Sequence, residues 1–364
     1  MKKWMAVVMA GSFGIPVFGQ GPAAKLRSQD LERVMGKFHA QVDLVPEDEI
    51  LDGRMIPIGS TTARRGSGIW KDSGNLYQGK PSYYFWMETN KGRRVELQTL
   101  FVTKQDVEKA ELNNEEILSH QKLSTLYHFG EGEAKKGERW VYEYGLFLPS
   151  TMDQTTSGII SQWHGMPDRT TVKDAEGKVV EHSFEEFRKD YLGKYDLEKE
   201  QLVRASDGKA SGEIIDAGGN PPMALKVGGG YLFLVCRADH SRVTVPGERV
   251  HLKPPLAKTK KSPEGNKEIF GLWEKKLSEL PRDQWMDVKF EVYWPEVKED
   301  RSGMRKNGEI KFFLDGSLMA EWRGPLGNND ERGTYFKYGI YVPGESGIEV
   351  WEAGFRQRKV KPGR

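Results

Sequence analysis

The sequence predicts an all-β fold built from antiparallel sheets, and three observations predict it. At least ten short apolar runs, rich in aromatic and β-branched residues, are separated by turn residues. The 364 residues include 41 Gly, 10 Trp, 13 Tyr and 16 Phe, a composition typical of many strands joined by tight turns. Residues 286–294 alternate Met286, Val288 and Phe290 with charged residues, which indicates a strand with one buried and one wetter face.

The strand pattern recurs along most of the chain after residue 80, and a single large β domain is the simplest organisation at this length. The predicted strands are Tyr83–Met87, Val95–Val102, Trp140–Leu148, Gly158–Trp163, Met223–Val227, Tyr231–Arg237, Met286–Trp294, Glu309–Leu314, Leu318–Trp322, Tyr335–Val342 and Ile348–Phe355.

Four stretches lie outside this pattern. Ser28–Lys37 predicts a short helix and Lys104–Tyr127 a longer one. Glu181–Val203 is charged all round and has no room inside a sandwich, so we expect a protruding helical insertion, a thumb of about 172–212 beside a groove. Pro254–Asn266 is rich in Pro, Lys and Gly and predicts a solvated surface loop.

The first residues resemble an export signal, because Lys2 and Lys3 precede a short apolar stretch that ends at Ala10. We therefore divide the chain into a signal peptide, 1–20, and a mature domain, 21–364, which we expect to be periplasmic or secreted. No apolar run approaches the roughly 20 residues that a membrane-spanning helix needs. We expect no membrane span.

Charge and cysteine content narrow the possible functions. Charged residues make up 30% of the chain, but the formal net charge is only +2, so nothing indicates bulk nucleic-acid binding. Any site for a polyanion must be local. Cys236 is the only cysteine, which leaves no intramolecular disulfide, and its apolar neighbours predict a buried small residue rather than a nucleophile.

A histidine stands at the end of one predicted strand. Residues Ser161–Thr171 read SQWHGMPDRTT, in which Trp163 and His164 end the apolar run and a turn follows. A histidine in this position is accessible for proton transfer. The alternative interpretation is a structural histidine that hydrogen-bonds to the backbone of the turn.

A second polar group lies near the C-terminus. Asn328–Val342 reads NNDERGTYFKYGIYV, in which Lys337 and Tyr341 share strand parity and so point to the same face. Their Cα atoms lie on the order of 13 Å apart in a regular strand, which suits a bound disaccharide better than one reacting atom. Gly339 permits a local kink between them.

Five strings carry a resemblance to a known family. QWHGMPDRT, GGNPPMAL, GRRVELQ and NDERGTYFKYGIY, with GKPSYYF at Gly79–Phe85, resemble the heparin lyase I family, polysaccharide lyase family 13, and the match is collinear from about Asp52. The resemblance implies a β-jelly roll with a thumb-like insertion, calcium dependence, and eliminative cleavage of heparin or highly sulfated heparan sulfate. We expect a monomer whose partner is this sulfated glycosaminoglycan.

The resemblance also implies roles for individual residues. His164 corresponds to the family's catalytic histidine and Tyr341 to its catalytic tyrosine. Substrate-binding positions fall on Arg94, Lys337, Gln162 and Arg169.

Calcium ligands are implied in the same way. The acidic ligand corresponds to Asp216, a main-chain carbonyl lies near Arg242, and the late ligands fall on Asn329 or Asp330. The family usually has Glu where this chain has Asp216, so the shorter carboxylate requires a backbone shift or a water. Family members also have a cysteine in the stretch matching Gly132–Lys136, which reads GEAKK here, and this argues that no cysteine is the base.

Elimination at a uronic acid needs a base at C5, an acid at O4 and a cation at the carboxylate. A neutral histidine accepts a proton near neutral pH better than an ordinary carboxylate does. A tyrosine phenol is protonated at neutral pH and can donate to the leaving oxygen. Calcium could act on the substrate carboxylate or order the surrounding loops, and we favour the ordering role.

Three other functions fit parts of the pattern. A non-catalytic glycan-binding module can use the same fold but needs no base and acid pair. A lyase for a different uronate polymer, such as chondroitin or an algal chain, is the stronger rival. A glycoside hydrolase needs two paired carboxylates, and Asp168, Asp216 and Asp330 are not paired by spacing.

Overall fold

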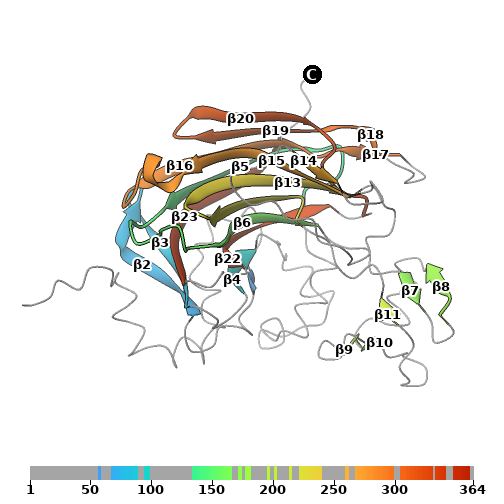
Figure 1. Cartoon of the computed structure of the whole chain (residues 1–364), viewed down its shortest axis with the longest axis horizontal. Coiled ribbons are helices and arrows are strands. Elements are labelled where there is room, and N and C mark those ends of the chain that lie inside the picture. Colours follow the sequence, from blue (N-terminus) through green and yellow to red (C-terminus); the bar gives the residue numbers. More distant parts are fainter. Residues whose placement is uncertain are drawn as a thin grey trace, which may run out of the picture.

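The chain forms a sandwich of two large β-sheets, as a computed structural model shows (Figure 1). The structure describes residues 56–58, 67–88, 94–98, 133–165, 171–173, 177–181, 195–196, 201–202, 213–214, 221–239, 259–261, 267–298, 304–330, 333–341 and 347–360. Neighbouring strands in both sheets pair antiparallel, apart from one short parallel ladder. The predicted β-jelly-roll sandwich of antiparallel sheets is confirmed.

The first sheet has nine strands. Their order is β1 (Ile56–Ile58), β4 (Arg94–Gln98), β22 (Thr334–Tyr341), β6 (Gly158–Gly165), β12 (Met223–Gly228), β13 (Tyr231–Asp239), β15 (Lys267–Lys276) and β14 (Thr259–Lys261). Strand β21 (Gly327–Asn328) pairs with the end of β13 in parallel. The two strands that carry the predicted histidine and tyrosine, β6 and β22, are therefore neighbours.

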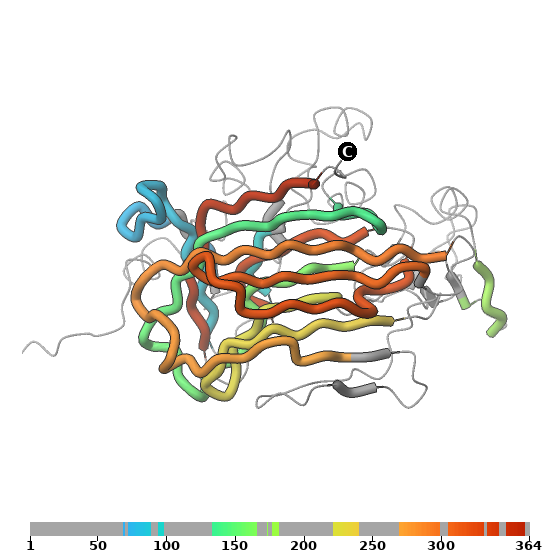
Figure 2. The backbone as a smooth tube through the Cα atoms, turned by 90° about the horizontal axis from the view of Figure 1, so that it is seen from above, coloured from blue at the N-terminus to red at the C-terminus, as the bar shows by residue number. Residues whose placement is uncertain are grey.

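The second sheet has seven strands. Their order is β2 (Ser67–Tyr77), β3 (Lys80–Met87), β23 (Ile348–Val360), β5 (Arg139–Phe147), β16 (Trp285–Tyr293), β19 (Gly308–Leu314) and β20 (Ser317–Gly324). Figure 2 shows β23, β5, β16, β19 and β20 running side by side along the long axis of the molecule. The 3-10 helix η4 (Leu277–Glu279) and the short pair β17 (Glu296–Val297) and β18 (Met304–Lys306) complete this part of the fold.

Aromatic side chains from both sheets meet in the core. The rings of Trp163 on β6 and Phe290 on β16 pack edge to face at 4.7 Å between centroids. Phe336 on β22 lies 4.7 Å from Trp163, and Phe312 on β19 stacks on Phe290. All four are fully buried. Each such side chain contributes about 1.5–3 kcal/mol of transfer free energy, so these contacts fix which face of β6 and β22 points inward.

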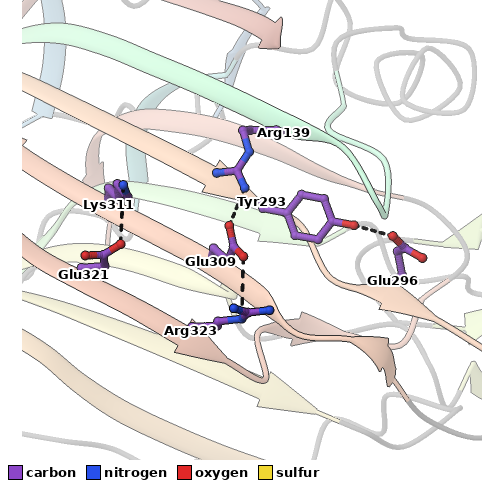
Figure 3. A network of polar contacts seen from close by, with 7 residues as sticks. All are labelled: Arg139, Tyr293, Glu296, Glu309, Lys311, Glu321 and Arg323. Atoms are coloured by element: carbon purple, nitrogen blue, oxygen red, sulfur yellow. Dashed lines mark hydrogen bonds and ion pairs between the residues drawn. The ribbon is translucent and has the colours of Figure 1, made fainter. Parts of the chain in front are cut away.

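The outer face of the second sheet carries ion pairs between residues of β5, β19 and β20 (Figure 3). Glu309 lies between Arg139 and Arg323, with 3.7 Å between its carboxylate and Arg323 Nε. Lys311 and Glu321 are 3.5 Å apart, and their side chains are 43% and 60% exposed. Exposed pairs of this kind contribute at most about 1 kcal/mol each. This part of the face is therefore solvated, with balanced charge.

The predicted strands are found in place. The alternation in residues 286–294 is confirmed, with Met286, Val288 and Phe290 buried and the charged residues between them more exposed. Within Val95–Val102 the structure describes the strand as far as Gln98. Cys236 is buried, and burial raises the pKa of its thiol well above the usual range, which confirms an inert small residue.

Two long strands were not predicted. Strand β2 is interrupted by a bulge between Asp72 and Leu76, where Asp72 Oδ1 accepts from the N–H of Gly74 at 2.8 Å. Strand β15 buries both Ile269 and Phe270 although they are consecutive, and the register also shifts along it. Bulges break the two-residue period on which strand prediction depends.

Most described residues of the predicted thumb lie in short strands. Short strands β7 (Thr171–Lys173), β8 (Val179–Glu181) and β11 (Glu213–Ile214) form one small sheet, which lies away from the two main sheets in Figure 1. Strands β9 (Tyr195–Asp196) and β10 (Gln201–Leu202) pair with each other. The helix predicted over Glu181–Val203 is wrong where that range is described, at Glu181, Tyr195–Asp196 and Gln201–Leu202, because short antiparallel ladders satisfy the backbone there.

The remaining predictions of secondary structure concern segments of which the structure describes only a part. Thr259–Lys261 is an edge strand paired with β15 and not loop, which corrects that part of Pro254–Asn266. The signal peptide 1–20 and the helices at Ser28–Lys37 and Lys104–Tyr127 lie outside the described residues. No helix in the described part of the chain is long and apolar enough to cross a membrane.

Candidate active site

Three neighbouring strands of the first sheet bring five of the predicted site residues together. In the register of β22 with β6, Lys337 lies opposite Gln162 and Tyr335 lies opposite His164. In its register with β4, Tyr341 lies opposite Arg94. Residues far apart in the sequence thus meet on one surface because β22 lies between β4 and β6.

Alternation along β22 decides which face this surface occupies. Phe336, Tyr338 and Ile340 belong to the core cluster between the sheets. Lys337 and Tyr341 have the opposite parity, so they share the outward face; a shared face was predicted. Tyr341 there packs beside a small apolar cluster that includes Ile159 and Phe233.

His164 is oriented by the backbone. Its Nδ1 is 2.6 Å from the carbonyl oxygen of Gly165. A carbonyl oxygen only accepts hydrogen bonds, so Nδ1 carries the proton and Nε2 is the basic nitrogen. The ring of Tyr335 lies 5.6 Å away between centroids, tilted by 40°. The predicted base is therefore held in one tautomer at the end of β6.

A buried carboxylate lies among the cations of the site. Glu96 on β4 is fully buried, and its Oε2 is 3.1 Å from Nε of Arg94. Gln162 donates from Nε2 to Oε1 of Glu96. Burial raises the pKa of Glu96 above its ordinary value, although the charges of Lys337 and Arg94 and the Gln162 hydrogen bond act in the opposite direction. Glu96 thus links three of the predicted substrate-binding residues.

The two cations differ in exposure. The guanidinium of Arg94 lies 4.5 Å from the centre of the Tyr341 ring, and its side chain is 27% exposed. The ammonium of Lys337 lies 5.0 Å from the centre of the Tyr335 ring, and Lys337 is only 1% exposed. Both aromatic rings offer their negative faces to a cation. Arg94 is therefore the more accessible of the two charges.

The kink that Gly339 permits is present. Gly339 has a φ of 116°, which favours glycine, and its register with β4 is regular. On the other side the pairing runs from Tyr338 opposite Ser161 directly to Tyr341 opposite Ile159. Two residues of β22 thus lie opposite one of β6, which is a β-bulge.

The loop after β21 lies against the histidine end of β6. Asn329 and Asp330 are 1% and 2% exposed, and Lys136 donates to the main-chain oxygen of Asp330. A Cβ on Gly165 would lie 2.9 Å from Asn328 Nδ2 and 3.4 Å from Asp330 Oδ2. Gly165 therefore allows this loop to approach the residue whose carbonyl holds His164.

The oxygen groups of this loop are of the kind that calcium prefers. Two further predicted ligands, Asp216 and Arg242, lie outside the described residues, as does Arg169 on the substrate side. Within the described part of the chain, no group of three or more His, Cys, Asp or Glu could hold a metal ion. The predicted calcium site thus depends on Asp216 and Arg242, which the structure does not describe.

Two site residues were not singled out from the sequence. Tyr335 has the same strand parity as Lys337 and Tyr341, and this parity could have identified it as a site residue. Glu96 stands in the string GRRVELQ, where alternation with Val95 and Leu97 places it on the outward face. The surface was expected to bind a polyanion, which a carboxylate repels, so the sequence offered no reason to select Glu96 as a site residue.

Comparisons with known proteins identify the family of the chain. The family model described as Polysaccharide lyase matches residues 77–357. The chain therefore belongs to this family and is a polysaccharide lyase, an enzyme that acts on a glycan. This sets aside the non-catalytic module and the hydrolase.

Individual relatives are more distant. The chain is 24% identical over 351 residues to heparin lyase I of Pedobacter heparinus, which covers 86% of this chain and 89% of that protein. Among solved structures, the alginate lyase AlyC3 is 9% identical with a TM-score of 0.38, covering 77% of this chain and 75% of its own. The alginate lyase vAL-1 from Chlorella virus is 12% identical with a TM-score of 0.36, covering 81% and 93%.

We predict that Glu96→Leu destabilises the protein by about 3–5 kcal/mol, because it removes a charge from a buried ionic cluster that includes Lys337. Denaturant unfolding at neutral pH measures the loss. Glu321→Leu on the exposed face of the second sheet is the control, with an expected loss below about 1 kcal/mol. Equal losses in the two variants would show that Glu96 does not compensate a buried cation.

Proposed function

We propose that the chain is an exported lyase that cleaves heparin or highly sulfated heparan sulfate by β-elimination at a uronic acid, and that it acts as a monomer. One observation carries the proposal: His164, Tyr341, Arg94, Lys337 and Gln162 lie on one face of three adjacent strands. The identity to a heparin lyase I over most of both chains supports the choice of substrate.

His164 is the proposed base. With Nδ1 hydrogen-bonded to Gly165, Nε2 can accept the C5 proton of the uronic acid. Tyr341 is the proposed acid, which protonates the O4 oxygen as the C4–O4 bond breaks and the C4–C5 double bond forms. Both groups thus exchange one proton each with the substrate, and the reaction needs no water.

The spacing of base and acid suits a sugar held between them. His164 and Ile159, which lies opposite Tyr341, are five residues apart on β6, which corresponds to roughly 16 Å in a regular strand. The imidazole and the phenol each extend several ångströms from their strands. The pair Lys337 and Gln162 lies midway, so the reacting uronate is proposed to sit above it.

The carboxylate of the substrate requires a positive environment. Charge moves into this group as C5 loses its proton, so a cation fixed there stabilises the transition state more than the ground state. Arg94 and Lys337 are the proposed cations, with Gln162 as a hydrogen-bond donor. Glu96 keeps these three groups in place, and its own charge limits the positive field that they produce.

Calcium is proposed to bind through Asp216, a main-chain carbonyl near Arg242, and Asn329 or Asp330. When bound, it supplies a local positive charge that holds these segments together. The described residues of this set lie in the loop against Gly165, which orients His164. The position of the loop supports an ordering role for calcium.

One observation favours a second candidate, a lyase for a less sulfated uronate polymer. The described site contains two of the predicted cations. Lys337 is buried, and its charge interacts with the carboxyl group of Glu96. Of these two, only Arg94 has a partly exposed charge. A highly sulfated chain requires more contacts than this. The thumb residues Lys189 and Lys194, which lie outside the described residues, would have to supply them.

We predict that His164→Ala lowers turnover by a factor of roughly 10² or more while folding and retention on heparin stay nearly intact, because the loss of a general base affects proton transfer alone. Ultraviolet absorbance of the unsaturated product measures turnover on heparin, heparan sulfate, chondroitin sulfate and alginate. Lys311→Ala on the second sheet is the control. Activity within about tenfold of wild type would rule out His164 as the base, and cleavage of alginate or chondroitin alone would rule out the heparin proposal.

Excess chelator is expected to lower both the melting temperature and the rate. A ligand that binds only the folded state stabilises it by about 2.7 kcal/mol at one hundred times its Kd. Calorimetry with and without calcium gives the stability independently of activity, and Asp216→Ala should reproduce the effect of the chelator. An unchanged melting temperature would mean that the protein binds no calcium.

We expect substrate binding to weaken steeply with salt despite the net charge of +2. Binding of a polyanion to Arg and Lys releases condensed counterions, so the salt dependence reports local contacts. Arg94→Ala should reduce the slope of log Kd against log salt, whereas Lys260→Ala in edge strand β14 should leave it nearly unchanged. Salt-insensitive binding would place the polymer on another surface.

A further inference from the structure

Glu352 is a buried carboxyl group that the proposed chemistry does not use. It lies on β23 of the second sheet, where its parity with Ile348 and Val350 directs it into the core, and it is fully buried. Burial raises the pKa of Glu352 well above its ordinary value. Burying a carboxyl group in an apolar core costs folding free energy unless hydrogen bonds compensate it.

The contacts of Glu352 are with two strands of the first sheet. Ser161 on β6 donates its hydroxyl to Oε1 of Glu352 at 3.2 Å. The main-chain N–H of Gly339 on β22 also donates to the Glu352 carboxyl. Tyr144 on β5 hydrogen-bonds to Ser161 at 2.8 Å and steadies its hydroxyl from the second sheet.

Both contacts lie at the bulge. Tyr338 and Ser161 form the last pair of the β22–β6 ladder before the register shifts. Gly339 follows Tyr338 on β22 and has no partner on β6 in that ladder. A side chain at Gly339 would clash, since its Cβ would lie 2.9 Å from the Cα of Glu96. The backbone there is thus confined by β4 on one side and held by Glu352 from the core.

The bulge determines where Tyr341 lies along β6. If β22 continued in the register of Tyr338 and Ser161, Tyr341 would lie opposite Gly158. With the bulge it lies opposite Ile159, one residue closer to His164, which is a shift of roughly 3.3 Å. A misplacement of about 1 Å can cost on the order of 10²-fold in rate, so this shift is large on the scale of catalysis.

We propose that Glu352 is a positioning residue for the elimination: from the core it binds both strands at the break in their ladder and so holds Tyr341 within reach of the sugar on which His164 acts. The inference rests on the proposed role of Tyr341. Glu352 touches no substrate, and its effect on turnover passes through the backbone of residues 339–341.

A double-mutant cycle tests this proposal. Glu352→Leu removes the acceptor at similar volume and should lower kcat by about tenfold or more, with direct binding of the polymer within about threefold. Glu352→Gln keeps an acceptor oxygen and should stay within about threefold of wild type. In the Tyr341→Phe background, Glu352→Leu should have little further effect, because both changes act on one step. The assay uses whichever uronate polymer the wild type cleaves, so failure of the heparin proposal leaves the test intact.

Controls separate positioning from general loss of stability. Val350→Ala, on the same strand and in the same core, should lower the melting temperature without lowering kcat at a temperature where the variant is folded. If Glu352→Leu fails to fold, Ser161→Ala removes one of the two contacts and should lower kcat by a smaller factor, again without effect in the Tyr341→Phe background. Multiplicative losses in the double variants, or equal losses of kcat in Val350→Ala, would overturn the proposal. Full activity of Tyr341→Phe alone would instead refute the assignment of the acid.

Discussion

The two-residue period of β22 is the constraint on which the active face depends. This strand lies between β4 and β6, and one of its faces is fixed in the core by Phe336, Tyr338 and Ile340. A slip of one residue in its pairing would turn every side chain to the other face. The aromatic contacts of Phe336 with Trp163 and Tyr144 oppose such a slip, so the core determines the position of Lys337 and Tyr341 without touching substrate.

Two buried carboxyl groups lie on either side of Gly339 and make the stability of the fold depend on pH. Glu96 is opposite Gly339 in the register with β4, and Glu352 accepts its N–H from the core. The pKa of each is raised from 4.5, chiefly by burial, so the folded state holds these protons more tightly than the unfolded state does. Their contribution to stability is complete below pH 4.5 and is lost as the pH rises through the folded pKa values. Carboxyl groups with pKa values raised in this way are more typical of an active site than of an ordinary core.

Much of this arrangement could be predicted from the sequence. The strings around His164 and Tyr341 fall on neighbouring strands, and their parity placed Lys337 and Tyr341 on one face. Even the kink at Gly339 was a permitted outcome. Glu352 could have been noticed in the same way, because it shares parity with Ile348 and Val350 in a predicted strand.

The pairing partners could not be predicted. The local sequence pattern does not predict that two residues of β22 lie opposite one residue of β6. The register of a strand pair arises from contacts between segments far apart in the chain. Strand β2 escaped prediction for a related reason, since the bulge after Asp72 interrupts its period. The partners of Glu96 are two cations and one amide on three strands, and only the folded sheet brings them together. Bulges and buried charge are properties of tertiary structure.

The base and the acid of the proposed reaction are supported from different parts of the fold. The loop of Asn328 and Asp330 lies against Gly165, whose carbonyl sets the tautomer of His164. At the other end, Glu352 of the second sheet holds the bulge that precedes Tyr341. A change in the loop should therefore disturb the base and leave the acid in place, whereas a change in the core should do the reverse. Since elimination requires both groups on the same sugar, their relative position depends on the stretch of β6 from Ile159 to His164, which joins the two supports.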